Sequence, residues 1–182
     1  SPDELYKLDV VAEQFGSSYT YDSNGNVTKV EDIQKQETEY KYEDNKLTEI
    51  IQNGNAKMTY TYYQNSHNVE TATTGTGVVY KFTYDTYGNN TSVSIVSGDT
   101  EITSSADYSD DGNRLESTTD ALDNETFYGY NENTNVLEWV RYPNDTEATR
   151  TEYTYDAMFR LLSATKDLNS NSAFSAAYTY SN

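Results

Sequence analysis

The chain has 182 residues, no cysteine, and a formal net charge of −18 from 12 basic and 30 acidic side chains. The absence of cysteine excludes disulfides, thiolate metal sites and cysteine nucleophiles. The sequence has an excess of acidic side chains and no clustered Lys/Arg patch of the kind that attracts nucleic acids. Its negative charge also disfavours binding to anionic membrane surfaces. No apolar run approaches the ~20 residues of a membrane span. We therefore expect no nucleic-acid partner and no membrane insertion.

A low aliphatic content combined with high net charge is typical of disordered chains. Two features of this sequence oppose disorder. Nineteen tyrosines supply apolar area that an aliphatic count ignores, and the sequence repeats itself at intervals that are typical of folded arrays. We therefore predict that the chain folds.

Residues 1–16 precede the regular repeats and allow two interpretations. The apolar residues from Leu5 to Phe15 have the spacing of one face of a short amphipathic helix, which would cap the array. Alternatively, Tyr6 and the residues that follow it belong to a degraded preceding repeat.

Residues 17–182 repeat a unit of two aromatics separated by one residue, a polar turn and an aliphatic segment. The second aromatics lie 20 to 25 residues apart, which indicates an array of seven to eight units. Function in such arrays usually lies in an extended surface, so an active site is not expected. The second aromatics are Tyr21, Tyr42, Tyr62, Tyr84, Tyr108, Tyr130, Tyr155 and Tyr180.

Each unit is predicted to fold as a β-hairpin. In the turn from Asp22 to Asn26, Asp and Asn tolerate left-handed backbone, and Gly25 supplies a positive φ without steric cost. The flanking Tyr-Thr-Tyr and Val-Thr-Lys-Val segments suit strands. Alternate strand residues share a face, so Tyr19 and Tyr21 point the same way and neighbouring hairpins set tyrosines beside tyrosines.

The predicted fold is therefore all-β, an array of stacked antiparallel hairpins forming a curved sheet, in which no hairpin is stable alone. The residues that define the repeats are Tyr19, Tyr21, Asp22, Gly25, Tyr40, Tyr42, Tyr60, Tyr62, Tyr84, Asp85, Gly88, Tyr108, Gly112, Tyr128, Tyr130, Tyr153, Tyr155 and Asp156.

The pattern Tyr-x-Tyr-Asp-x-x-Gly-Asn/Arg-Leu/Val resembles the hallmark of the Rhs/YD-repeat family. The best matches are residues 19–27, 82–89 and 153–161, and the resemblance covers nearly the whole chain. It implies a segment of a large extracellular protein, such as a bacterial Rhs or wall-associated toxin, an insecticidal toxin complex subunit or a teneurin. In that family the hairpins spiral into a hollow shell.

The resemblance implies a non-catalytic structural role in the shell or stalk of a secreted or surface-anchored bacterial protein, with neighbouring repeats of the parent protein as partners. One family feature is not found. The sequence has no Pro…Asp-Pro-x-Gly-Leu run of the kind that closes the repeats in many Rhs toxins, and its only prolines are Pro2 and Pro143. It therefore resembles an internal segment without cargo or autoprotease.

A carbohydrate-binding or adhesion module is the alternative function. Tyrosine rings stack on sugars, neighbouring Asn and Asp supply hydrogen bonds, and arrays gain avidity from several weak sites. The paired tyrosines are expected to form the packed face of the sheet instead. Tyr63 and Tyr87 lie outside the pairing, at turns, and are expected to be exposed. With Trp139 they are the candidate ligand-binding residues.

No metal or cofactor is required by the sequence. The segments beginning at Asp22 and Asp110 resemble pieces of calcium loops, but the twelfth position counted from Asp22 is Ile33, so an EF-hand loop is excluded. Ca²⁺ bridging of acidic turns remains an alternative. His67 is the only histidine and is expected to be exposed, and among thirty acids no carboxylate pair stands out for glycoside hydrolysis. We do not expect an enzyme.

Overall fold

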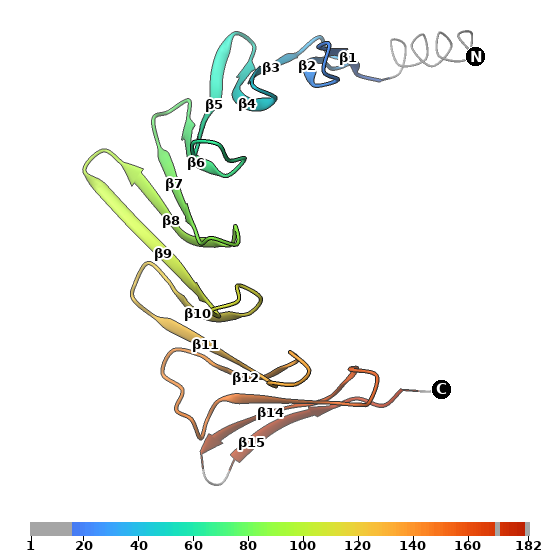
Figure 1. The fold of residues 1–182 in the computed structure, drawn as a ribbon, viewed down its shortest axis with the longest axis vertical. Helices are drawn as coiled ribbons and strands as arrows, with labels where there is room; N and C mark the ends of the chain where they lie inside the picture. Colours follow the sequence, from blue (N-terminus) through green and yellow to red (C-terminus); the bar gives the residue numbers. More distant parts are fainter. Residues whose placement is uncertain (1–15, 170–171, 181–182) are drawn as a thin grey trace. The chain divides into compact units, whose positions relative to one another are not determined.

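The computed structural model describes residues 16–169 and 172–180, with side chains to residue 166 and again from 173, and all regular elements in these ranges are strands (Figure 1). The predicted N-terminal segment, 1–16, lies outside the described residues except for Gly16. The strands are β1 (Ser18–Tyr21), β2 (Val27–Glu31), β3 (Glu37–Glu43), β4 (Lys46–Gln52), β5 (Asn55–Tyr62), β6 (Val69–Thr74), β7 (Val79–Tyr84), β8 (Asn90–Ser97), β9 (Thr100–Tyr108), β10 (Leu115–Thr119), β11 (Glu125–Tyr130), β12 (Leu137–Arg141), β13 (Thr151–Tyr155), β14 (Leu161–Asn169) and β15 (Ser172–Ala177).

Strands that follow one another in sequence also pair in the sheet, from β1 to β15, without a crossover. The strand order is linear and does not return from β15 to β1, so the sheet is open. This confirms the predicted all-β class and the array of antiparallel hairpins.

The chain divides into two compact units, which are described separately. One comprises residues 1–82 and 94–101, and the other residues 83–93 and 102–182. The first contains β1 to β6 and the second β10 to β15, while β7 to β9 contribute to both.

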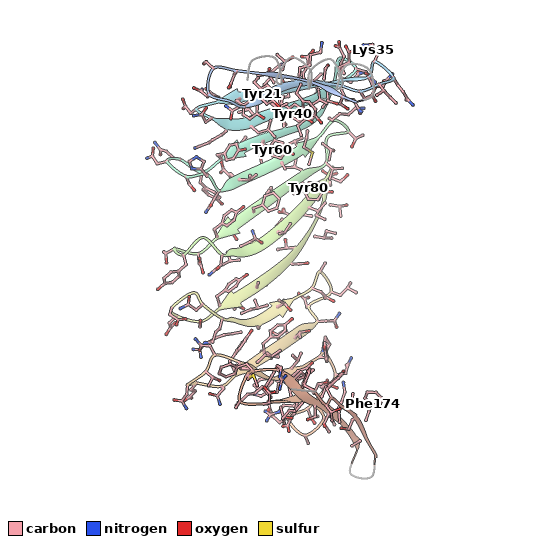
Figure 2. The ribbon with its side chains drawn as sticks, turned by 90° about the vertical axis from the view of Figure 1, so that its right-hand side faces the viewer. Tyr21, Lys35, Tyr40, Tyr60, Tyr80 and Phe174 are labelled. Carbon is pink, nitrogen blue, oxygen red and sulfur yellow. The ribbon has the colours of Figure 1, made fainter. Side chains whose placement is uncertain are left out.

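Tyrosines and charged residues alternate between the two faces of the first unit. On β3, Tyr40 and Tyr42 are half-buried while Lys41 between them is exposed. The same alternation recurs on β5, where Tyr60 and Tyr62 are half-buried. Figure 2 shows the labelled tyrosines following one another across the strands of this unit. The predicted tyrosine ladder is therefore present, with the period of two that a half-buried strand requires.

The opposite face of the first unit is polar and partly ion-paired. Lys41 lies directly across from Glu49 and contacts it at 2.7 Å between Nζ and Oε2. Thr61 and Thr71 are also paired across strands, and their hydroxyl oxygens are 2.8 Å apart. Such cross-strand pairs each stabilise a sheet modestly, by about 0.2–1 kcal/mol.

A β-bulge recurs where six of the second tyrosines pair with the strand that follows. Tyr42 pairs with Leu47 while the preceding Lys41 pairs with Glu49, so Thr48 is the extra, unpaired residue. The same shift of register occurs at Tyr21, Tyr62, Tyr108, Tyr130 and Tyr155. Bulges re-aim side chains and increase the local twist. The extra residues are Thr28, Thr48, Glu70, Glu116, Glu138 and Leu162.

Within residues 16–169 and 172–180, no second layer of strands or helices covers the tyrosines of either unit. Among the described residues the buried apolar side chains are Ala72 and Val140, each 4 % exposed, and no large side chain is fully buried. The paired tyrosines between Tyr40 and Tyr155 are half-buried. The expectation of a packed face is wrong for the first and last pairs, because Tyr19 and Tyr21 are 56 % and 58 % exposed and Tyr178 and Tyr180 are also exposed. The tyrosine rings of this sideways-packed ladder lie beside neighbouring rings on the same face of the sheet. They are therefore less buried than they would be beneath a second layer.

Candidate functional site

An aspartate organises the turn between β1 and β2. The Asp22 Oδ1 accepts the backbone N–H groups of Asn24 at 2.9 Å and Asn26 at 2.8 Å, and Oδ2 accepts the Asn26 side-chain amide at 2.9 Å. The backbone N–H of Gly25 donates to the Asp22 carbonyl, and Gly25 has a φ of +87°. Both carboxylate oxygens therefore hold the turn, which explains why Asp follows the second tyrosine.

The same turn recurs in both units and at both ends of the strands. The carboxylates of Asp85 and Asp156 follow second aromatics and accept the corresponding N–H groups. Asp32 and Asp120 build identical turns after β2 and β10, at the opposite strand ends, which the sequence interpretation did not identify. Figure 2 labels Lys35 in the Asp32 turn, at the other end of the strands from Tyr21. The sequence feature that marks these two turns is an Asp four residues before an Asn or Gln.

Hydrogen bonds lower the pKa of the Asp22, Asp156 and Asp111 carboxyl groups. For Asp22 the main cause is the Asn26 side-chain amide, and for Asp156 it is the backbone N–H of Arg160. The Ser109 hydroxyl, then the backbone and side-chain N–H groups of Asn113, lower the pKa of Asp111 from 3.8 to about 2. A carboxylate held ionised in this way is unsuited to donate a proton as a general acid.

Two repeats carry a cation over their second tyrosine. The Lys46 Nζ lies 5.4 Å from the ring centroid of Tyr62, and the Arg160 guanidinium carbon lies 4.4 Å from that of Tyr180. Each cation immediately precedes a leucine in the sequence. The Tyr62 hydroxyl donates to the Leu47 carbonyl at 2.7 Å, and the Tyr180 hydroxyl donates to the equivalent leucine carbonyl, also at 2.7 Å. These contacts join one repeat to the next.

Shallow grooves lie beside the same turns. In the first unit a groove of about 290 Å³ is lined by Lys46, Thr48 and the segment 60–62. In the second unit a groove of about 320 Å³ lies at the equivalent position, with Val136, Glu138 and the segment 153–155 in its lining. Both grooves include a bulged residue, so the bulge shapes this part of the surface.

The predicted ligand-binding residues Tyr63 and Tyr87 are exposed, and their hydroxyls are engaged with the backbone. Tyr63 is 37 % exposed and donates to the Phe82 carbonyl at 2.9 Å. Tyr87 is 62 % exposed and donates to the Asp110 carbonyl at 3.0 Å. Its ring lies against Gly112, where a Cβ would overlap it. Both tyrosines connect neighbouring repeats while leaving part of the ring accessible.

Trp139 is half-buried in the middle of β12. It pairs across the sheet with Gly129, and its indole covers that glycine. The guanidinium carbon of Arg150 lies 4.8 Å from its ring centroid. Binding of a ligand by Tyr63, Tyr87 and Trp139 stays a prediction.

The described part of the chain contains no group of three or more His, Asp or Glu side chains placed to hold a metal ion. His67 is exposed, as its turn position indicates. Within the same residues, no helix has the length and apolar character needed to cross a membrane.

An open meander of antiparallel hairpins, joined by aspartate turns and aromatic contacts, defines a structural repeat array. The chain belongs to the teneurin YD-shell family, whose model matches residues 6–182. This confirms the resemblance to the Rhs/YD-repeat family, and membership assigns the chain a structural, shell-type role.

Solved structures show the same fold. The chain is similar to the crystal structure of TcdB2-TccC3, with 21 % identity and a TM-score of 0.57 over 88 % of this chain and 8 % of that one. It is also similar to TcdB2-TccC3 without its hypervariable C-terminal region, with 14 % identity and a TM-score of 0.51 over 90 % of this chain and 12 % of that one. The chain thus spans a small fraction of the structures it matches. Among curated protein sequences, none matches it.

Proposed function

We propose that this chain is a non-catalytic wall segment of a larger shell-forming protein, secreted or held at a bacterial cell surface. The observation that carries the proposal is the linear strand order. Among the described residues, β1 and β15 each have one partner strand, so each presents an outer edge that a further hairpin can extend. A polymorphic toxin shell is the finer form of the same proposal.

Amide hydrogen exchange tests this role. In the isolated 182-residue chain, the amides on the outer edge of β15 are expected to exchange rapidly. In the intact parent protein a following hairpin protects them, while central strands such as β5 exchange alike in both samples. Equal exchange of β15 in the chain and in the parent would contradict a place inside a continuous wall.

Carbohydrate binding is the second candidate, favoured by the exposed ring of Tyr87. A glycan array probed with the purified chain, with and without calcium, tests it. Tyr87→Phe keeps the ring and is expected to retain binding, whereas Tyr87→Ala is expected to lose it. Calcium bridging of acidic turns is a separate proposal, supported by the abundance of acids. A melting temperature that is equal in calcium and in chelator would contradict it.

A further inference from the structure

One repeat of the second unit differs in charge from the Lys46 and Arg160 repeats. Lys46 and Arg160 each precede a leucine and lie over the second tyrosine of the next repeat. In the repeat that leads to Tyr155, the corresponding position before the leucine is Val136. The bulged position two residues later is Glu138, whereas it is uncharged in the Lys46 and Arg160 repeats. The position of Lys46 and Arg160 is therefore apolar here, while the bulge carries an acid, as it also does at Glu70 and Glu116.

The groove at this repeat combines aromatic and acidic groups. It has a volume of about 320 Å³ and is lined by Val136, Glu138, Tyr155, Asp156 and Phe159, among others. Asp156 is ion-paired with Arg160, at 2.6 Å between Oδ2 and Nε, so the carboxylate offered to a ligand is that of Glu138. Phe159 is 59 % exposed and has a φ of +59°, so the Asp156 turn presents its ring to solvent.

Glu138 is held at the groove by a hydrogen bond. The Asn131 side-chain amide donates to its Oε1 at 2.7 Å, and the Glu138 side chain is exposed to solvent. A tyrosine ring beside a carboxylate is a surface that attracts a cation, through the ring face and through direct charge.

We propose that this groove binds the guanidinium or ammonium group of an arginine or lysine side chain presented by another polypeptide segment. The precedent lies within the chain, where Lys46 and Arg160 make the same contact with Tyr62 and Tyr180. One exposed cation–π contact is weak. A side chain carried by a polypeptide adds backbone contacts that a free amine lacks.

The test is an NMR titration of the full 182-residue chain with ¹³C-labelled tyrosine, the Tyr155 signals being assigned by comparison with Tyr155→Phe. The probe is the peptide acetyl-Gly-Gly-Arg-Gly-Gly-amide. Its matched control carries citrulline, a neutral side chain of nearly the same shape. We expect saturable shifts at Tyr155 with arginine and an affinity about two- to fivefold lower with citrulline.

Two variants of the protein test the position of the site. Val136→Arg supplies an internal cation and is expected to abolish the response of Tyr155, while Val136→Leu retains it. Glu138→Gln, an exposed substitution, is expected to weaken binding of the arginine peptide about two- to fivefold and to leave binding of the citrulline peptide unchanged.

The proposal is overturned if the two peptides bind equally, if shifts are spread over all tyrosines, or if Val136→Arg and Glu138→Gln both leave the titration unchanged. A final titration uses methylguanidinium in place of the peptide. If it binds as tightly as the arginine peptide, the groove is a site for small cations and a polypeptide partner is refuted. Because Glu138 is exposed, Glu138→Gln keeps the test decisive even where Val136→Arg does not fold.

Discussion

Gly129→Ala is expected to destabilise the second unit by about 1–3 kcal/mol, which is the usual cost of overpacking. A Cβ at this position would overlap the indole of Trp139, so the ring must move away from β11 and from Arg150. Two smaller contributions to the free energy of unfolding nearly cancel. Losing the cation–π contact costs about 0.5–1 kcal/mol, and replacing Gly by Ala inside a strand returns about 0.5–1 kcal/mol.

Urea unfolding followed by fluorescence measures this effect, because Trp139 is the only tryptophan and reports on the second unit. The decisive control repeats Gly129→Ala in a Trp139→Val background and follows unfolding by circular dichroism. Without the indole, alanine is expected to stabilise by about 0.5–1 kcal/mol. If Gly129→Ala destabilises equally in both backgrounds, or not at all, the packing of Trp139 on Gly129 is not the reason for the glycine.

Three further predictions concern the ladder and the turns. Tyr62→Phe removes the hydrogen bond to the Leu47 carbonyl and is expected to cost about 0.5–1.5 kcal/mol in urea unfolding; no loss would show that water replaces the tyrosine hydroxyl as the donor to that carbonyl. Tyr84→Ala, at a half-buried central position, is expected to cost about 2 kcal/mol, and Tyr180→Ala, near the chain end and 43 % exposed, clearly less; equal losses would contradict the sideways-packed ladder. The lowered pKa of Asp111 contributes stability that is complete above about pH 4 and is lost as the pH falls toward about 2. Asp111→Asn should flatten this part of the plot of unfolding free energy against pH. An unchanged plot would refute the contribution of Asp111.

The local turn chemistry was predictable from the sequence, because it depends on residues close together in the chain. The Asp22 turn, with Gly25 at positive φ, follows directly from the side chains of five consecutive residues. The Asp156 turn departs from the expectation that a glycine occupies the left-handed position. Phe159 takes the place of Gly25 there and has a φ of +59°. Asp156 accepts the same hydrogen bonds there, so the aspartate defines this turn more than the glycine does.

The contacts between repeats were not predictable, because they depend on register. The pattern of aromatic pairs places Tyr42 and Tyr62 on one face but does not reveal that the strand after each contains one extra residue. The carbonyl that accepts from the Tyr62 hydroxyl belongs to Leu47, the residue beside the extra Thr48. Glu138, which lines a groove, is itself an extra residue. Neither contact can be read from the spacing of the aromatic pairs alone.

The absence of a covered core among the described residues explains how so acidic a chain folds with so few aliphatic residues. In a buried core, carboxylates would be excluded by the cost of desolvation. In a single-layer array the acids lie at turns and on the polar face, where backbone N–H groups or lysines satisfy them, as Asp22 and Glu49 show. Tyrosine suits the other face, because its ring packs sideways on neighbours while its hydroxyl reaches a backbone carbonyl or water. Stability then grows with each added repeat, which is the property a shell wall requires.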